Sequence, residues 1–235
     1  MTLLLLSGEG PTDLGACNVE TPRICDPDKW RPGPLALLMD QLFEAHMGYS
    51  AIDAQCIYFL HRSNLSRLAK KLNHPALRGT GMNLEHRRGT QALASAALAL
   101  SRCHNNSPVI ALYFRDCGGS HSGTQPSWDD LYASMTGEKS GFSMLGVPGV
   151  AMLPKPISEA WLICALKSNP YAHCDDLENR SPSDKADYPL KEEYADCLAV
   201  HGKSIDDLIR PSGQGELPVV DARRIRMKSF SVFEA

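Results

Sequence analysis

The sequence predicts an α/β domain of three layers, in which helices cover both faces of a mainly parallel sheet. Short apolar runs typical of buried strands occur at Leu3–Leu6, at 54–60 and at 109–114. Segments whose apolar residues recur every three or four positions lie between them, and such alternation is typical of parallel sheets. The chain has 235 residues, which is enough to bury a substantial core without disulfides or metal.

The first strand predicts where a site would be built. Its four leucines are followed by Ser7-Gly8-Glu9-Gly10-Pro11, so the strand stops abruptly and delivers Glu9 to its carboxyl end. In open α/β sheets, ligands bind at that end of the strands. Glu9 is alternatively an ordinary solvated turn residue.

The elements that follow are predicted from apolar spacing and from helix-capping residues. Residues 8–34 lack periodicity and are rich in Gly, Pro and Asp, which favours a long loop. Pro34 is typical of a first helical turn, and the helix it opens ends near Gly48. The remaining predicted elements are strands at 54–60, 109–114 and 150–153, helices at 63–72, 89–102, 128–135, 157–167, 190–200 and 219–227, and a flexible loop at 117–127.

The predicted domain organisation has two parts. The alternating strands and helices end near Lys167, so residues 1–167 form the α/β domain. Residues 168–235 form a helical C-terminal extension packed on the same domain, because no repeat and no clear linker separates them.

The apolar runs and the cysteines lead us to expect a cytoplasmic protein. No run approaches the roughly 20 apolar residues of a membrane span, and Leu3–Leu6 is too short for a signal-peptide core. The eight cysteines contain no C-x-x-C pair, which favours reduced, mostly buried thiols. A structural zinc site drawing on Cys17, Cys25 or the His173-Cys174 pair is an alternative.

Charge is unevenly distributed along a chain whose net charge is −3. Residues 61–88 hold seven Lys or Arg and one acid, and residues 129–200 hold twelve acids and six bases. The basic stretch is compatible with a polyanionic partner, or is the solvated face of a helix. The acidic stretch from Asp175 to Asp196 is either a partner surface or a soluble exterior.

Three acids lie at or near the ends of predicted apolar segments: Glu9, Asp116 and Glu159. Acids at the ends of adjacent parallel strands converge on one crevice even when they are far apart in sequence. Carboxylates that no protein cation neutralises are the ligands that hard ions such as Mg²⁺ take. The sequence therefore predicts a site for Mg²⁺ or Mn²⁺, and Glu9 could instead act as a general base.

The motifs around these acids resemble one family. The strand followed by Glu9-Gly10-Pro11-Thr12-Asp13, the strand ending in Phe114-Arg115-Asp116, and Lys155-Pro156-x-x-Glu159-Ala160-Trp161 are similar to the TOPRIM fold. The likeness is to small bacterial standalone TOPRIM-like proteins related to OLD-type nucleases, some of which take part in phage defence. It spans roughly residues 1–165.

The resemblance implies a metal-dependent nuclease acting on DNA or RNA. It assigns Glu9 as acid/base or metal ligand, Asp116 as the first aspartate of an Asp-x-Asp motif, and Glu159 as the later acid. Mg²⁺ or Mn²⁺ would be the cofactor, and a partner ATPase or another defence-system subunit is a possible partner. The side chains expected to steer the phosphates are Arg62, Lys70, Arg87, Arg115 and Lys155.

The chain departs from the family pattern at the second aspartate, where it has Gly118. Losing a carboxylate weakens the hold on a divalent ion. Asp129, Asp130 or Ser120 could complete a site. Alternatively, the protein is a catalytically degenerate subunit that binds nucleic acid or a partner without cutting.

Two further motifs bear on the function. Asp116-Cys-Gly-Gly-Ser120 is similar to the phosphatase loop of the haloacid-dehalogenase family, but it lacks the same aspartate. Gly8-Glu9-Gly10-Pro11-Thr12 is not a phosphate-binding P-loop, because no Gly-Lys-Ser/Thr follows.

Overall fold

The computed structural model describes residues 1–10, 12–18, 24–72, 82–117, 127–213 and 215–234. Its contacts divide the chain into two compact units. Unit 1 comprises Met1–Arg31, Ala51–Arg115 and Ser120–Met152, and unit 2 comprises Pro32–Ser50, Asp116–Gly119 and Leu153–Ala235. These limits differ from the predicted domains 1–167 and 168–235, because the segment just before Lys167 packs with the C-terminal residues.

Unit 1 contains a parallel sheet of four strands, which confirms the α/β class. The strands are β1 (Leu3–Gly8), β4 (Ile57–Phe59), β5 (Val109–Phe114) and β6 (Gly149–Met152), arranged in the order β4-β1-β5-β6. β1 is a central strand, and its Leu4, Leu5 and Leu6 are at most 1% exposed. A strand buried on both faces needs such an unbroken apolar run.

The strand order reverses direction at β1 and β5. The chain moves from β1 outward to β4, then returns across β1 to β5 and continues to β6. Ligands of open α/β sheets bind outside the carboxyl ends of the strands at this reversal. The two strands approach closely there: a Cβ atom added at Gly8 would lie only 2.4 Å from the carbonyl oxygen of Phe114.

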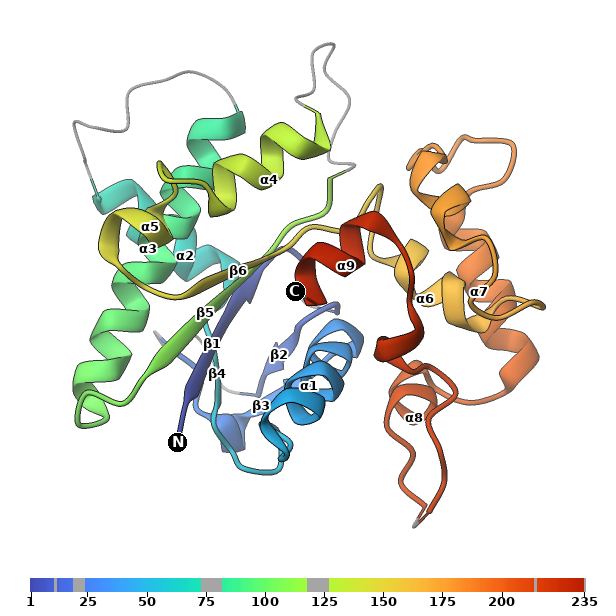
Figure 1. Cartoon of the computed structure of the whole chain (residues 1–235), viewed down its shortest axis with the longest axis horizontal. Helices are drawn as coiled ribbons and strands as arrows, with labels where there is room; N and C mark the ends of the chain where they lie inside the picture. The colour runs from blue at the N-terminus through green and yellow to red at the C-terminus, as the bar shows by residue number, and fades with distance from the viewer. Residues whose placement is uncertain (11, 19–23, 73–81, 118–126, 214, 235) are drawn as a thin grey trace. The chain divides into compact units, whose positions relative to one another are not determined.

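The described α-helices of unit 1 gather on one side of this sheet (Figure 1). α2 (Arg62–Lys71) and α3 (Met82–Cys103) contact β1, α3 also contacts β5, and α4 (Trp128–Thr136) contacts β6. α5 (Gly141–Leu145) packs on α3 and was not predicted from sequence.

Side chains cap the starts of α4 and α2. Ser127 caps α4, and Asp130 completes its capping box. α2 begins one residue before the predicted start at 63, and the ring of His61 accepts a hydrogen bond from the backbone N–H of Ser63.

The prediction of a structureless loop at 8–34 is wrong in part. β2 (Gly15–Cys17) and β3 (Trp30–Pro32) pair as a two-stranded sheet, and a short 3₁₀ helix, η1 (Pro27–Lys29), precedes β3. Cys25 also bridges to Phe59 of β4. Because these strands have three residues each, they are too short to show an alternating apolar pattern.

The prediction of reduced cysteines is wrong for four of the eight. Disulfide bonds join Cys17 to Cys25 and Cys164 to Cys174, with Cα atoms 6.1 and 5.2 Å apart. These pairs include the thiols considered for a zinc site, so the bonds leave no thiolate there to hold zinc. Disulfides are typical of oxidising compartments, and the cytoplasmic location stays a prediction.

Unit 2 is built around α6 (Glu159–Leu166), whose residues from Ala160 to Leu166 are all buried. Trp161 lies against Phe230 and Phe233 of α9 (Lys228–Glu234), with ring centroids 4.8 and 5.9 Å apart. α6 therefore shares its core with the C-terminal segment, which is why the contacts do not divide at Lys167. The other elements of unit 2 are α1 (Pro34–Met47), η2 (Cys174–Asn179), α7 (Leu190–His201), α8 (Ile205–Ile209) and η3 (Ala222–Arg224).

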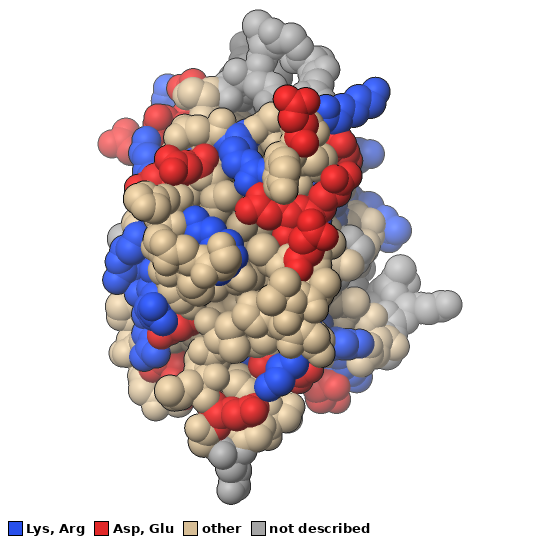
Figure 2. All heavy atoms as spheres, turned by 90° about the vertical axis from the view of Figure 1, so that its right-hand side faces the viewer, with Lys and Arg blue, Asp and Glu red and all other residues tan. Residues whose placement is uncertain are grey.

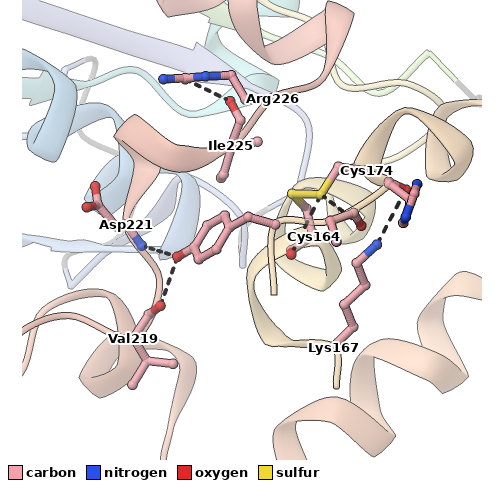
Figure 3. The surroundings of a disulfide bond; sticks show 10 residues. Cys164, Lys167, Cys174, Val219, Asp221, Ile225 and Arg226 are labelled. Atoms are coloured by element: carbon pink, nitrogen blue, oxygen red, sulfur yellow. Dashed lines mark hydrogen bonds between the residues drawn. A yellow bond between two sulfur atoms is a disulfide. The ribbon is translucent and has the colours of Figure 1, made fainter. Parts of the chain in front are cut away.

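The predicted helix at 219–227 is wrong, since only the short turn η3 forms there. Side chains take the backbone groups that a helix would have paired. Gln41 donates to the carbonyls of Ile209 and Val220 and accepts from the N–H of Ala222. The hydroxyl of Tyr171 likewise donates to the carbonyl of Val219 and accepts from the N–H of Asp221. Figure 3 shows Val219 and Asp221 together with the disulfide Cys164–Cys174, and the backbone N–H of Tyr171 donates to the carbonyl of Cys164.

Acidic side chains of unit 2 gather on the surface where α7 lies (Figure 2). Asp175 and Asp176 of η2, and Glu192 and Asp196 of α7, are exposed. Among the helices that the structure describes, none combines the length and apolar character that crossing a membrane requires.

We predict that Leu5→Ala lowers the free energy of unfolding by about 3 kcal/mol, because it leaves a cavity in a fully buried strand. Leu98→Ala is the matched control, since Leu98 is 39% exposed, and it should cost less than about 0.5 kcal/mol. Urea unfolding followed by circular dichroism measures both values. Equal losses in the two variants would contradict the placement of β1 in the core.

Candidate anion-binding site

A cavity of about 320 Å³ lies in unit 1 beside the carboxyl ends of β1 and β5. The strands contribute Gly8, Tyr113 and the following residue Arg115, and helices α2 and α3 supply the rest of the wall. The residues that line it are Gly8, Arg62, Leu65, Ser66, Ala69, Lys70, Leu84, Glu85, Arg88, Gly89, Tyr113 and Arg115.

Helical spacing explains which side chains reach the cavity. Arg62, Ser66 and Lys70 recur every fourth residue along α2 and therefore share one face. Glu85 and Arg88 are three residues apart in the first part of α3 and are neighbours for the same reason. α3 can pack this closely only because residue 89 is glycine, since a Cβ there would lie 2.5 Å from the hydroxyl of Tyr113.

Two arginines hold Glu9. Its Oε1 lies 2.8 Å from Nη2 of Arg62 and 2.8 Å from Nη1 of Arg115. The same Nη1 of Arg115 lies 3.3 Å from Oε1 of Glu85. Protein cations therefore neutralise Glu9, whereas the predicted metal site required carboxylates that no protein cation neutralises.

The cavity nevertheless keeps an excess of positive charge. Its walls and the adjoining Glu9 bring four cations, Arg62, Lys70, Arg88 and Arg115, against two carboxylates. Within the described part of the chain, neither Lys70 nor Arg88 forms an ion pair. Arg115 is only 9% exposed, and its buried Nε has no hydrogen-bond partner among the described residues. An anionic ligand fits this balance, because a guanidinium binds phosphate or carboxylate oxygens in pairs.

His86 is buried next to this charge network. It is 2% exposed, and neither ring nitrogen has a hydrogen-bond partner among the described residues. Burial, followed by the positive charge of Arg115, lowers the pKa of His86 from 6.5 to about 4, against an opposing effect of Glu85. The imidazole is therefore neutral at pH 7 and adds no charge to the site.

The other two predicted acids, Asp116 and Glu159, lie in unit 2, and each contacts Ser158. Oδ1 of Asp116 accepts a hydrogen bond from the backbone N–H of Ser158 at 2.9 Å, and the hydroxyl of Ser158 lies 3.3 Å from Oε2 of Glu159. Asp116 thereby pairs with the backbone N–H of the residue just before α6, which gives this carboxylate a structural role at the start of that helix. Glu9 belongs to unit 1, and a meeting of all three acids stays a prediction.

The predicted phosphate-steering residues are only partly brought together. Arg62, Lys70 and Arg115 line the cavity, whereas Arg87 is half-buried and is absent from its walls. Lys155 lies in unit 2, where its charge counters part of the rise in the pKa of Cys117, which burial causes. Gly118 and Ser120 lie outside the described residues.

Arg88, Glu85 and Tyr113 are the site residues that sequence reasoning missed. The helix was predicted to start at Gly89, which left Glu85 and Arg88 outside it. Their three-residue spacing ahead of the alanine-rich run was the available signal. Tyr113 looked like an ordinary residue of a buried strand.

Comparisons with protein-family models, with curated proteins and with solved structures found no match to this chain. Among the described residues, no three His, Cys, Asp or Glu side chains are grouped so that they could hold a metal ion. The local geometry therefore supplies the evidence for function.

We predict that the free energy of unfolding decreases as the pH is lowered from 6.5 to 4, partly because of His86. The unfolded chain takes up a proton on this histidine near pH 6.5 and the folded chain only near pH 4, so acid favours unfolding in between. Relative to His86→Phe, the wild type should lose about 3 kcal/mol across this window. Urea unfolding at several pH values measures the difference.

The control for this prediction is His46→Gln, at an exposed position of α1. It should follow the wild-type pH profile. A His86→Phe variant with that same profile would show that His86 does not contribute to the acid sensitivity.

Proposed function

We propose that the protein binds nucleic acid, with a phosphate of the strand held in the cavity at the carboxyl ends of β1 and β5. The observation that carries this proposal is the surplus of cationic side chains there, together with the Nε of the nearly buried Arg115, which has no hydrogen-bond partner among the described residues. Phosphate contacts from Lys and Arg dominate the affinity of proteins for nucleic acids.

The walls of the cavity support a nucleotide rather than a bare anion. Leu65, Ala69 and Leu84 add apolar surface beside the charged groups. Specific small-molecule sites combine mostly apolar walls with a few placed polar groups, and their usual volumes begin near 300 Å³. A base could lie against the apolar side while its phosphate meets Arg88 and Lys70. The resemblance to TOPRIM proteins supports the same class of ligand.

We predict that Arg88→Ala weakens binding of single-stranded DNA at least about fivefold, since it removes one phosphate contact. The slope of log K against log salt should become shallower by about 0.7. Fluorescence anisotropy with labelled oligothymidylate at several salt concentrations measures both quantities. Arg102→Ala is the matched control, because Arg102 is an exposed arginine of α3 outside the cavity. Equal binding by the two variants would reject the proposal.

A second candidate is the Mg²⁺- or Mn²⁺-dependent nuclease, and Ser158 is the reason to keep it. In unit 2, Asp116 contacts the backbone N–H of this residue and Glu159 contacts its hydroxyl, so both carboxylates are neighbours of Ser158. Magnesium is often held by one or two carboxylates together with the phosphates of the substrate, so these two acids would hold it and the ion would polarise a phosphoryl oxygen. Glu9, paired with two arginines, does not fit as a third ligand. A partner ATPase or defence-system subunit belongs to this second proposal.

For this nuclease, we predict that Glu159→Gln abolishes DNA or RNA cleavage in the presence of Mn²⁺ and weakens Mn²⁺ binding measured by calorimetry. Glu192→Gln, an exposed acid of α7, should change neither. Metal binding that is identical in the wild type and both variants would remove Glu159 from the proposed metal site. Wild-type protein that binds DNA in salt-sensitive fashion but never cuts it would favour the first proposal.

A further inference from the structure

A second cavity, of about 510 Å³, lies in unit 1 on the other side of α2. Its wall is formed by α2, by the middle of α3 and by Ile24. The residues that line it are Ile24, Asn64, Arg67, Leu68, Lys71, Leu72, Ser95, Ala96 and Ala99.

α2 separates the two cavities, and its sequence divides between them with helical spacing. Residues 62, 66 and 70 face the first cavity, and residues 64, 67, 68 and 71 face the second. The helix carries Arg62, Arg67, Lys70 and Lys71 and no acid. Each cavity therefore receives two of its four cations.

The second cavity has the chemistry of a nucleotide site. The described residues that line it include no acid, and both Arg67 and Lys71 are exposed. Leu68, Ala96 and Ala99 give an apolar surface, beside the polar side chains of Asn64 and Ser95. A nucleobase has apolar faces and polar edges and is attached to an anionic phosphate, so its parts match these three kinds of surface.

We infer that a single strand of nucleic acid crosses α2, with one nucleotide in the first cavity and a later nucleotide of the same strand in the second. This inference rests on the proposed function and extends it to the path of the ligand. The cations of α2 form the ridge between the two subsites, and a helix is about 10 Å across with its side chains. A strand of a few nucleotides spans that width, whereas a dinucleotide occupies only one subsite.

The experiment compares two ligands, a dinucleotide and an octanucleotide of thymidylate, each labelled for anisotropy. Arg67→Ala combined with Lys71→Ala should weaken the octanucleotide about tenfold and make its salt slope shallower by about 1.4, as expected for two lost phosphate contacts. It should leave the dinucleotide unchanged. Arg88→Ala should weaken both ligands, because the first cavity binds each of them.

The matched control is Arg102→Ala combined with Lys139→Ala, which removes two exposed cations of unit 1 outside both cavities. It should bind both ligands as the wild type does. An Arg67→Ala/Lys71→Ala variant with wild-type affinity for the octanucleotide, while Arg88→Ala weakens both ligands, overturns the path but leaves the proposed function standing. The path is likewise overturned, and the proposed function stands, if the Arg67→Ala/Lys71→Ala variant keeps its affinity for the octanucleotide but loses binding of a fluorescent fatty acid or an acidic peptide. Arg88→Ala without effect on either ligand overturns the proposed function itself.

Discussion

The pairing of β1 with β5 is the constraint on which the rest of unit 1 depends. Six consecutive residues of each strand lie in register, from Leu3 beside Val109 to Gly8 beside Phe114. This register brings the ends of the two strands to the same level, so Glu9 and Arg115 follow them side by side and form an ion pair. The close contact at Gly8 fixes that level, because a larger residue would push the strands apart.

The charges around Arg115 decide which chemistry the site favours. A carboxylate at a strand end suits a divalent cation only when no protein cation competes for it. Here two guanidinium groups hold Glu9, and further cations stand nearby in the wall of the cavity. The result is a site that attracts anions, although the same carboxylate by itself suggested a metal ligand.

Much of the fold could be predicted from sequence, because the strands of a buried parallel sheet are apolar throughout and the helices α1 and α4 begin with recognisable residues. The position of Glu9 at the end of β1 and the basic character of α2 were also predictable. Partners that are distant in sequence were not. The disulfides, the hold of Gln41 on the segment before η3, and the packing of Trp161 on Phe230 all join residues that only the complete fold brings together. For the site, the missed element was the pairing of Glu9, since the residue types give no sign of which arginines will reach it.

Helix α2 contributes cations to both cavities, so the two sets of basic groups do not move independently. The helix rests on one buried side chain, Leu65, and begins at the ring of His61. All four of its cations belong to one helix, so a tilt of α2 moves the basic groups of both faces together. The contacts that the two faces make with a ligand would therefore strengthen or weaken at the same time.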